Sequence, residues 1–167
     1  TGVFALAKNP KAATLFQKFT PKKLYVGLVE GNFHLDEMHQ TFPHLSNKTK
    51  VVVKKTPASK MCEHFIYKVK STEKFSALAI KLLSGRKHQI RVGLSHLNFP
   101  LIGDQKYGSG KFFNRQALHA FALQIDSEPL VIAPIEEKLC SAFRSYCKVE
   151  EMDFKNKLSQ LQEANLW

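Results

Sequence analysis

The sequence predicts an α+β fold in which a mixed, largely antiparallel sheet is flanked by helices. Segments with the alternation of strands follow one another along the chain, with few helical patterns between them. Such runs of strands are typical of α+β domains, whereas regular alternation of strands and helices would favour a parallel sheet. The length of 167 residues and a hydrophobic content of 44% fit one globular unit with a real core.

Six segments have the character of strands. Residues 23–30 alternate, with Leu24, Val26 and Leu28 on one face. The remaining strands are expected at residues 3–7, 49–54, 62–70, 74–83 and 117–125. Residues 31–48 are polar and rich in His, Asn and Thr, and we expect a long loop or a β-excursion there.

Helical spacing is found in four places. Asn9 and Pro10 have the character of an N-cap and a first helical residue, and apolar residues then follow at helical spacing, which predicts an amphipathic helix over 10–19. Ile90, Leu94 and Leu97 predict a helix over 88–97. Two further apolar stripes near the C-terminus are Leu139, Ala142, Phe143 and Tyr146, and then Phe154, Leu158 and Leu161.

The expected organisation is one main domain over residues 1–148, followed by a helical tail over 149–167. The tail is expected to pack on its own domain, with a role as a partner-binding helix as the alternative. No apolar run approaches the length of about 20 residues that a membrane span needs, and the first residues lack the pattern of a signal peptide. The three cysteines show no CxxC spacing, which predicts reduced thiols in a cytosol-like compartment, either cytoplasm or an organelle matrix.

The charge of the chain is strongly positive and unevenly distributed. The formal net charge is +11, and residues 1–115 contain 20 Lys and Arg against 6 Asp and Glu. Residues 126–167 contain 5 basic against 8 acidic residues. A basic field over two thirds of the chain favours a polyanionic partner, because each neutralised phosphate releases condensed counterions. The alternative is a basic domain without a nucleic-acid partner.

The segment from Ser84 to Arg91 lies where a predicted strand gives way to a predicted helix. Such a junction offers unpaired backbone N–H groups and the positive end of a helix dipole to an anion. Arg86, Lys87 and Arg91 add three cations, and Arg91 follows Lys87 by one helical turn. The segment is therefore a candidate phosphate-binding site, with a solvated basic turn as the equally open alternative.

Residues 84–108 read SGRKHQIRVGLSHLNFPLIGDQKYG. This stretch resembles the third motif region of RluA-type RNA pseudouridine synthases, roughly TGRxHQIRxHxxxxGxPLxGDxxYG. Residues 23–31 (KLYVGLVEG) are similar to the KxYxAxVxG strand of that family, and residues 118–123 (LHAFAL) are similar to its LHAxxL strand. The resemblance extends over about residues 1–145.

The resemblance implies an enzyme that isomerises uridine to pseudouridine in structured RNA, either ribosomal or transfer RNA, without a metal or another cofactor. It implies that Tyr25 packs on the turned-out base, that Arg91 pairs with a catalytic aspartate, and that Leu118 lines the uracil pocket. Arg86, Lys87, His88 and Gln89 are the expected substrate-binding residues of the basic segment. We expect a monomer with no membrane partner.

Physical arguments agree with these roles. A uridine in structured RNA must leave its stack before its glycosidic bond can be reached, and the extruded base needs a flat apolar partner such as Tyr25. A carboxylate in a partly dry pocket needs a cation such as Arg91 to stay ionised. Without the motif, the favoured interpretation of Tyr25 is an ordinary strand aromatic, and that of Leu118 is a core leucine.

The sequence departs from the family pattern in several places. The catalytic aspartate of the HRLDxxTSG loop would fall about four residues before Thr1, so we expect the natural protein to extend upstream, and Asp104 is interpreted as a turn residue. Gly93 stands where a His is common, and Asn98 stands where the family has a Gly that needs positive φ; Ser84 replaces a Thr.

Two rival functions remain open at this point. One is a catalytically silent RNA-binding protein on the same scaffold, because the aspartate is missing from this stretch. The other is a basic domain without an RNA partner. His34, His39 and His44 lie five residues apart, which fits no common metal-binding spacing, and we expect no metal site.

Overall fold

A single twisted sheet forms the centre of the computed structural model, which describes residues 1–16, 19–46 and 51–167. The sheet has seven strands in the order β3-β2-β4-β5-β1-β6-β7. The strands are β1 (Lys22–Glu30), β2 (Glu37–Ser46), β3 (Val51–Val53), β4 (Lys60–Ser71), β5 (Phe75–Leu82), β6 (Leu118–Gln124) and β7 (Val131–Ile132). The helices are α1 (Pro10–Phe16), α2 (Gln89–His96), α3 (Glu137–Cys147) and α4 (Glu151–Glu163). All pairings between these named strands are antiparallel, so the predicted α+β class is confirmed.

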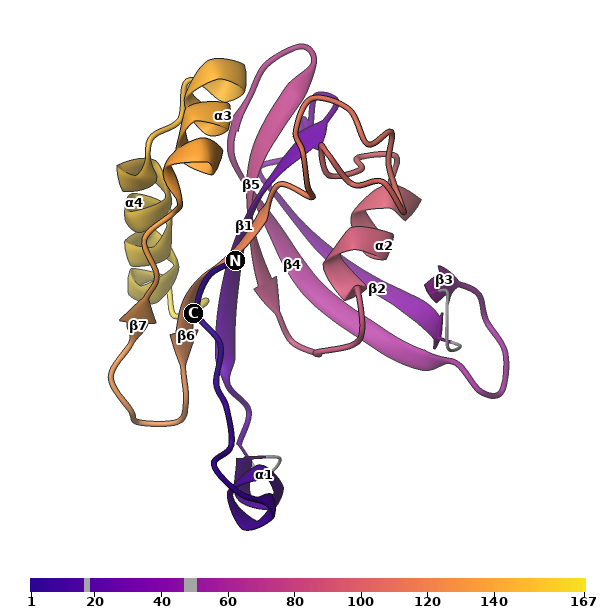
Figure 1. The fold of residues 1–167 in the computed structure, drawn as a ribbon, viewed down its shortest axis with the longest axis vertical. Coiled ribbons are helices and arrows are strands. Elements are labelled where there is room, and N and C mark those ends of the chain that lie inside the picture. Colours follow the sequence, from indigo (N-terminus) through magenta and orange to yellow (C-terminus); the bar gives the residue numbers. More distant parts are fainter. Residues whose placement is uncertain (17–18, 47–50) are drawn as a thin grey trace.

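Helices cover both faces of the sheet, with α3 and α4 on one side and α2 on the other (Figure 1). The alternation of β1 explains this arrangement. Leu24, Val26 and Leu28 point into the larger core, which α3 and α4 share. Val29 and the partly buried Tyr25 lie on the opposite face, in the core that α2 closes with Ile90 and Leu94. The central strand therefore needs apolar residues on both faces.

The C-terminal segment contributes to the larger core. Phe154, Leu158 and Leu161 of α4 and the final Trp167 are buried against it. The Trp167 indole N–H donates a hydrogen bond to the Gln124 side chain at 3.2 Å, which fixes the end of the chain beside β6. The residues after 148 thus form part of the same hydrophobic core as the sheet.

The sequence-based assignment differs from the structure at the N-terminal end. The strand expected at residues 3–7 is wrong: only an isolated parallel bridge between Gly2 and Ala120 forms, and the chain then leaves the sheet. The helix expected over 10–19 is α1, which ends at Phe16; residues 17–18 lie outside the described part of the chain. None of the α1 side chains is buried, and Figure 1 shows α1 projecting beyond the sheet.

The polar stretch at residues 31–48 contains β2, which pairs with β4 along eight residues. Of the two alternatives predicted for residues 31–48, the β-excursion is therefore the one that forms. The short strand β7 was not predicted from the sequence. Inward positions of β2 hold Gln40, Phe42 and His44, all buried. Two of these three residues are polar, so the hydrophobic alternation of β2 is hidden in the sequence. Residues 47–50, including the start of the strand expected at 49–54, lie outside the described part.

Candidate active site

The candidate site lies where the N-terminal residues meet β1 and β6. Both backbone groups of Ala120 form hydrogen bonds with this segment. The Val3 N–H donates to the Ala120 carbonyl at 2.9 Å, and the Ala120 N–H donates to the Thr1 carbonyl at 3.0 Å. The pairing of β1 with β6 shifts in register between Leu24 and Tyr25. An added Cβ on Gly2 would lie 2.2 Å from the Ala120 oxygen, so only glycine allows this close approach.

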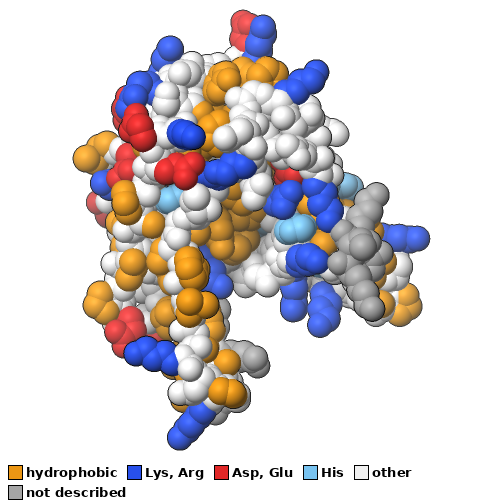
Figure 2. Space-filling model, in the orientation of Figure 1, with side chains coloured by type: hydrophobic (Ala, Val, Ile, Leu, Met, Phe, Trp, Pro, Cys, Tyr) orange, Lys and Arg blue, Asp and Glu red, His pale blue; other side chains and the backbone are white. Residues whose placement is uncertain are grey.

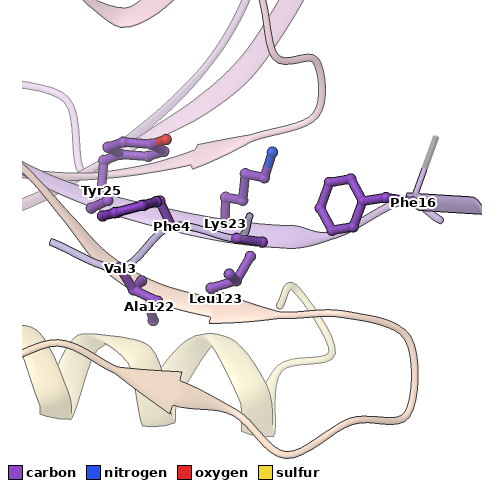
Figure 3. A pocket seen from close by; sticks show the side chains of 9 residues that line it. Val3, Phe4, Phe16, Lys23, Tyr25, Ala122 and Leu123 are labelled. Carbon is purple, nitrogen blue, oxygen red and sulfur yellow. The ribbon is translucent and has the colours of Figure 1, made fainter. Parts of the chain in front are cut away.

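A pocket opens beside this junction, with a cavity volume of about 170 Å³. Figure 3 shows its wall, in which Tyr25 and Lys23 rise from the same side of β1 and Phe4 lies close to the tyrosine ring. The lining residues are Val3, Phe4, Ala5, Phe16, Lys23, Tyr25, Ala120, Ala122 and Leu123. Apolar and aromatic groups therefore make up most of the wall, as expected for a site that receives a flat ring.

Tyr25 is the predicted site residue that the structure places in this pocket. Burial raises the pKa of its phenol above the ordinary value, so the hydroxyl remains protonated and uncharged near neutral pH. A neutral ring in an apolar wall suits stacking against a nucleobase.

Leu118 lies on the same face of the sheet as Tyr25. The two residues pack against the same hydrophobic core. Leu118 is the register partner of Gly27, two residues beyond Tyr25 on β1. A Cβ on Gly27 would meet the Leu118 side chain at 3.4 Å and the Leu101 side chain at 3.0 Å, so the missing side chain lets both leucines close over β1 beside the tyrosine.

Arg91 lies on the same side of the sheet as Tyr25, but it does not line the pocket. Its Nε donates to Asp104 Oδ2 at 2.8 Å and its Nη2 donates to Asp104 Oδ1 at 2.7 Å. The Arg91 guanidinium also lies over the Tyr107 ring, 5.1 Å from its centre. The structure therefore pairs Arg91 with the turn aspartate of the third motif region.

Asp104 holds this arginine from a buried position, with a side chain only 1% exposed. Burial opposes ionisation of its carboxyl group, but hydrogen bonds from Arg91 and from the N–H groups of Lys106 and Tyr107 outweigh that effect, so the pKa of Asp104 lies below its ordinary value. Asp104 Oδ1 accepts these two N–H groups at 3.0 and 3.1 Å. The interpretation of Asp104 as a turn residue thus agrees with these hydrogen bonds, and the same carboxylate orients Arg91.

The four expected substrate-binding residues of the basic segment differ in their surroundings. Arg86 and Lys87 are exposed. His88 has left-handed backbone (φ 55°) and a hydrogen bond of 3.0 Å between Nδ1 and the Tyr107 hydroxyl. Gln89 is buried: its side-chain oxygen accepts from Ser84 at 2.9 Å and from the Arg86 N–H at 3.0 Å, and its amide donates to the Glu63 carbonyl at 3.0 Å. Gln89 therefore fixes the loop that presents the two cations.

Lysine and arginine side chains border an apolar hollow on the side of α2 (Figure 2). Exposed cations in this part of the chain include Lys54, Lys55, Lys60, Arg86 and Lys87. This arrangement matches the uneven charge of the sequence, because the acidic residues of α3 and α4 lie on the other side of the sheet. Cations therefore gather around the hollow on the side of α2.

Two residues near the pocket were not among the expected site residues. Lys23 lines the pocket. Arg115 forms an ion pair with Glu136 and donates from Nη2 to the Thr1 hydroxyl at 3.2 Å, while that hydroxyl also lies 3.0 Å from His119 Nδ1. Lys23 could have been found from β1, where it shares the face of Tyr25. The contact of Arg115 with a residue 114 positions away left no local signal.

Two general findings concern the described residues only. No group of three or more His, Cys, Asp or Glu side chains is arranged to hold a metal ion in the ranges given above. Within those ranges, no helix combines the length and apolar character needed to cross a membrane.

Comparison with solved structures identifies the class of the fold. A human protein described as RNA pseudouridylate synthase domain containing 1 superposes with a TM-score of 0.67, at 24% identity, over 81% of this chain and 65% of the other. A second human protein, RNA pseudouridylate synthase domain containing 4, gives a TM-score of 0.68 at 16% identity, over 84% of this chain and 68% of the other. The fold is thus that of pseudouridylate synthase domains.

The sequence gives the family itself. Residues 1–96 match the model of the RNA pseudouridylate synthase family, and the chain belongs to that family. It is 33% identical over 138 residues to ribosomal large subunit pseudouridine synthase D of Borreliella burgdorferi, covering 75% of this chain and 41% of the relative. It is 31% identical over 150 residues to an uncharacterized RNA pseudouridine synthase of Bacillus subtilis, covering 85% and 48%. The chain spans about half the length of these relatives.

Proposed function

We propose that this chain forms the body of an enzyme that converts uridine to pseudouridine in RNA. The observation that carries the proposal is the meeting of Tyr25 and Leu118 on one face of the sheet, beside an apolar pocket at the junction of β1, β6 and the N-terminal residues. Membership of the family supplies the reaction class. The chemistry breaks the N1–C1′ bond, joins C5 to C1′, and moves a proton from C5 to N1, so nothing is consumed.

Tyr25 supplies the flat surface for the extruded uracil, and Leu118 helps to exclude water from that side of the ring. The carboxylate of the reaction comes from an aspartate that precedes Thr1 in the family pattern. The hydrogen bonds that hold Thr1 to Arg115 and His119 support this placement, because they fix the backbone next to the pocket. Arg91 lies on the same face of the sheet, where its ion pair with Asp104 holds the guanidinium in one orientation.

We further propose ribosomal RNA as the substrate, because relatives of this chain are named ribosomal large subunit pseudouridine synthases. Residues 1–148 form the catalytic part, and residues 149–167 pack against the face of the sheet opposite Tyr25. The protein acts as a monomer in the cytoplasm or an organelle matrix, which agrees with three free cysteines.

Release of tritium from C5 tests the reaction directly. RNA transcribed with [5-³H]UTP is incubated with the protein, including the residues that precede Thr1 in its reading frame. We expect tritium in the water and pseudouridine in the digested RNA, and neither with Tyr25→Ala. RNA binding without tritium release would instead establish a catalytically silent binder, and would overturn the proposal.

A further inference from the structure

Lys23 is a cation in an otherwise uncharged pocket wall. Of the residues that line the pocket, all within the described ranges, the other eight are apolar or aromatic. The alternation of β1 places Lys23 on the face of Tyr25, and Figure 3 shows the two side chains rising together from the strand. A stacking surface for a base therefore has a positive charge at one end.

Lys23 lies between two neighbouring hollows. Besides the pocket with Tyr25, it lines a second hollow with Leu82, Ser84 and Gly85 at the end of β5. Its Nζ lies 3.9 Å from the point where Gly85 would carry a Cβ, so the ammonium group lies beside the backbone of that loop. Lys23 thus stands at the boundary between the apolar pocket and the loop that carries Arg86.

The spacing suits a nucleotide better than a free base. Residues two apart on a strand are about 6.5 Å apart along its axis. This is comparable with the distance from a nucleobase to a phosphate on its own ribose, so one nucleotide can reach both side chains. An ammonium group on a flexible stem is well suited to a phosphate, which it contacts as a point charge.

We propose that Lys23 binds a phosphate of the nucleotide whose base enters the Tyr25 pocket, and thereby makes the pocket select nucleotides over free nucleosides. The inference rests on the proposed function, since it assumes that the pocket receives uridine. Such a contact positions the nucleotide without reading sequence, because phosphates carry no base information.

The chain offers a matched control in Lys22. It is also a lysine of β1, but it lies on the opposite face, near Lys81, whose pKa is lowered by burial and, to a smaller degree, by the charge of Lys22. Lys81 donates to the Leu166 carbonyl at the C-terminal end of the chain, behind the sheet. Lys22→Met and Lys23→Met therefore remove the same charge from the same strand on different faces.

The test compares uridine with its 5′- and 3′-monophosphates by protein NMR, through the shifts of the Ala120 and Ala122 amides. For the unmodified chain we expect at least one monophosphate to bind about tenfold more tightly than uridine, the strength of one charge-assisted contact. Lys23→Met should abolish the preference, Lys22→Met should retain it, and Lys23→Arg should restore most of it. The dispersion of each spectrum reports whether the variant is folded.

Equal binding of uridine and both monophosphates by the unmodified chain would overturn this inference and leave the proposed function standing. A preference that survives Lys23→Met would also overturn it, by assigning the phosphate to another cation. If neither uridine nor its monophosphates shift the pocket amides, the pocket is not a uridine site, and the proposed function falls together with the inference.

Discussion

Arg91 and Asp104 form a bidentate ion pair in which the Asp104 side chain is almost completely buried and the Arg91 side chain is 16% exposed. The pair joins α2 to the turn after it, and the turn reinforces the carboxylate with two backbone N–H groups. Asp104 therefore holds one arginine orientation on the face that carries the pocket.

Asp104→Asn should destabilise the fold by about 2 to 3 kcal/mol, because it leaves a partly buried guanidinium without its counter-charge. Urea unfolding followed by circular dichroism measures the loss. Asp36→Asn is the control. Asp36 also forms an ion pair, with Lys68, but the Asp36 side chain is 95% exposed. An Asp104→Asn variant as stable as the control would show that the pair adds nothing to the fold.

Gly93→Ala should destabilise the protein by about 1 kcal/mol, although alanine is the better helix former by about the same amount. A Cβ at this position would lie 2.9 Å from the Phe42 ring and 3.0 Å from His64, both buried. Overpacking therefore outweighs helix propensity. Thermal unfolding of Gly93→Ala is compared with that of the unmodified chain. A higher melting temperature would contradict the close packing.

His64 should make stability depend on pH between about 6.5 and 4. Burial, with a smaller effect of His39, lowers the pKa of His64 from 6.5 to about 4. The unfolded chain binds the proton more readily, so the stabilisation is complete above pH 6.5 and is lost as pH falls toward 4; the full effect is on the order of 3 kcal/mol. His64→Leu should flatten the difference between unfolding free energies at pH 7 and pH 4.5, whereas exposed His34→Leu should not. Identical slopes for both variants would refute this assignment.

Tyr25→Ala should weaken binding of uridine monophosphate about tenfold or more, because stacking of a base on an aromatic ring contributes about 1 to 3 kcal/mol. Tyr25→Phe retains the ring and should bind nearly as the unmodified chain. Tyr146→Ala, in α3 behind the sheet, is the control. The NMR titration described above provides the measurement. If the Phe and Ala variants bind alike, the ring does not stack on the base.

Local sequence patterns predicted much of the sheet. The strong alternation of residues 23–30 predicted β1 and placed Tyr25 on the face opposite Leu24. The helical spacing of Ile90, Leu94 and Leu97 predicted α2, and the basic residues after Ser84 predicted the cations that precede this helix. The patterns failed where burial and polarity disagree. Gln40 and His44 occupy inward positions of β2, and the apolar residues of α1 remain unburied.

By itself, the sequence determined the class of fold, the faces of β1 and the family, because these depend on periodicity and on contiguous motifs. The tertiary structure decided which groups meet. Thr1 reaches His119 across 118 residues, and Arg91 meets Asp104 instead of the pocket. These contacts depend on chain topology and on competition among several possible partners, and no local spacing encodes the result of that competition.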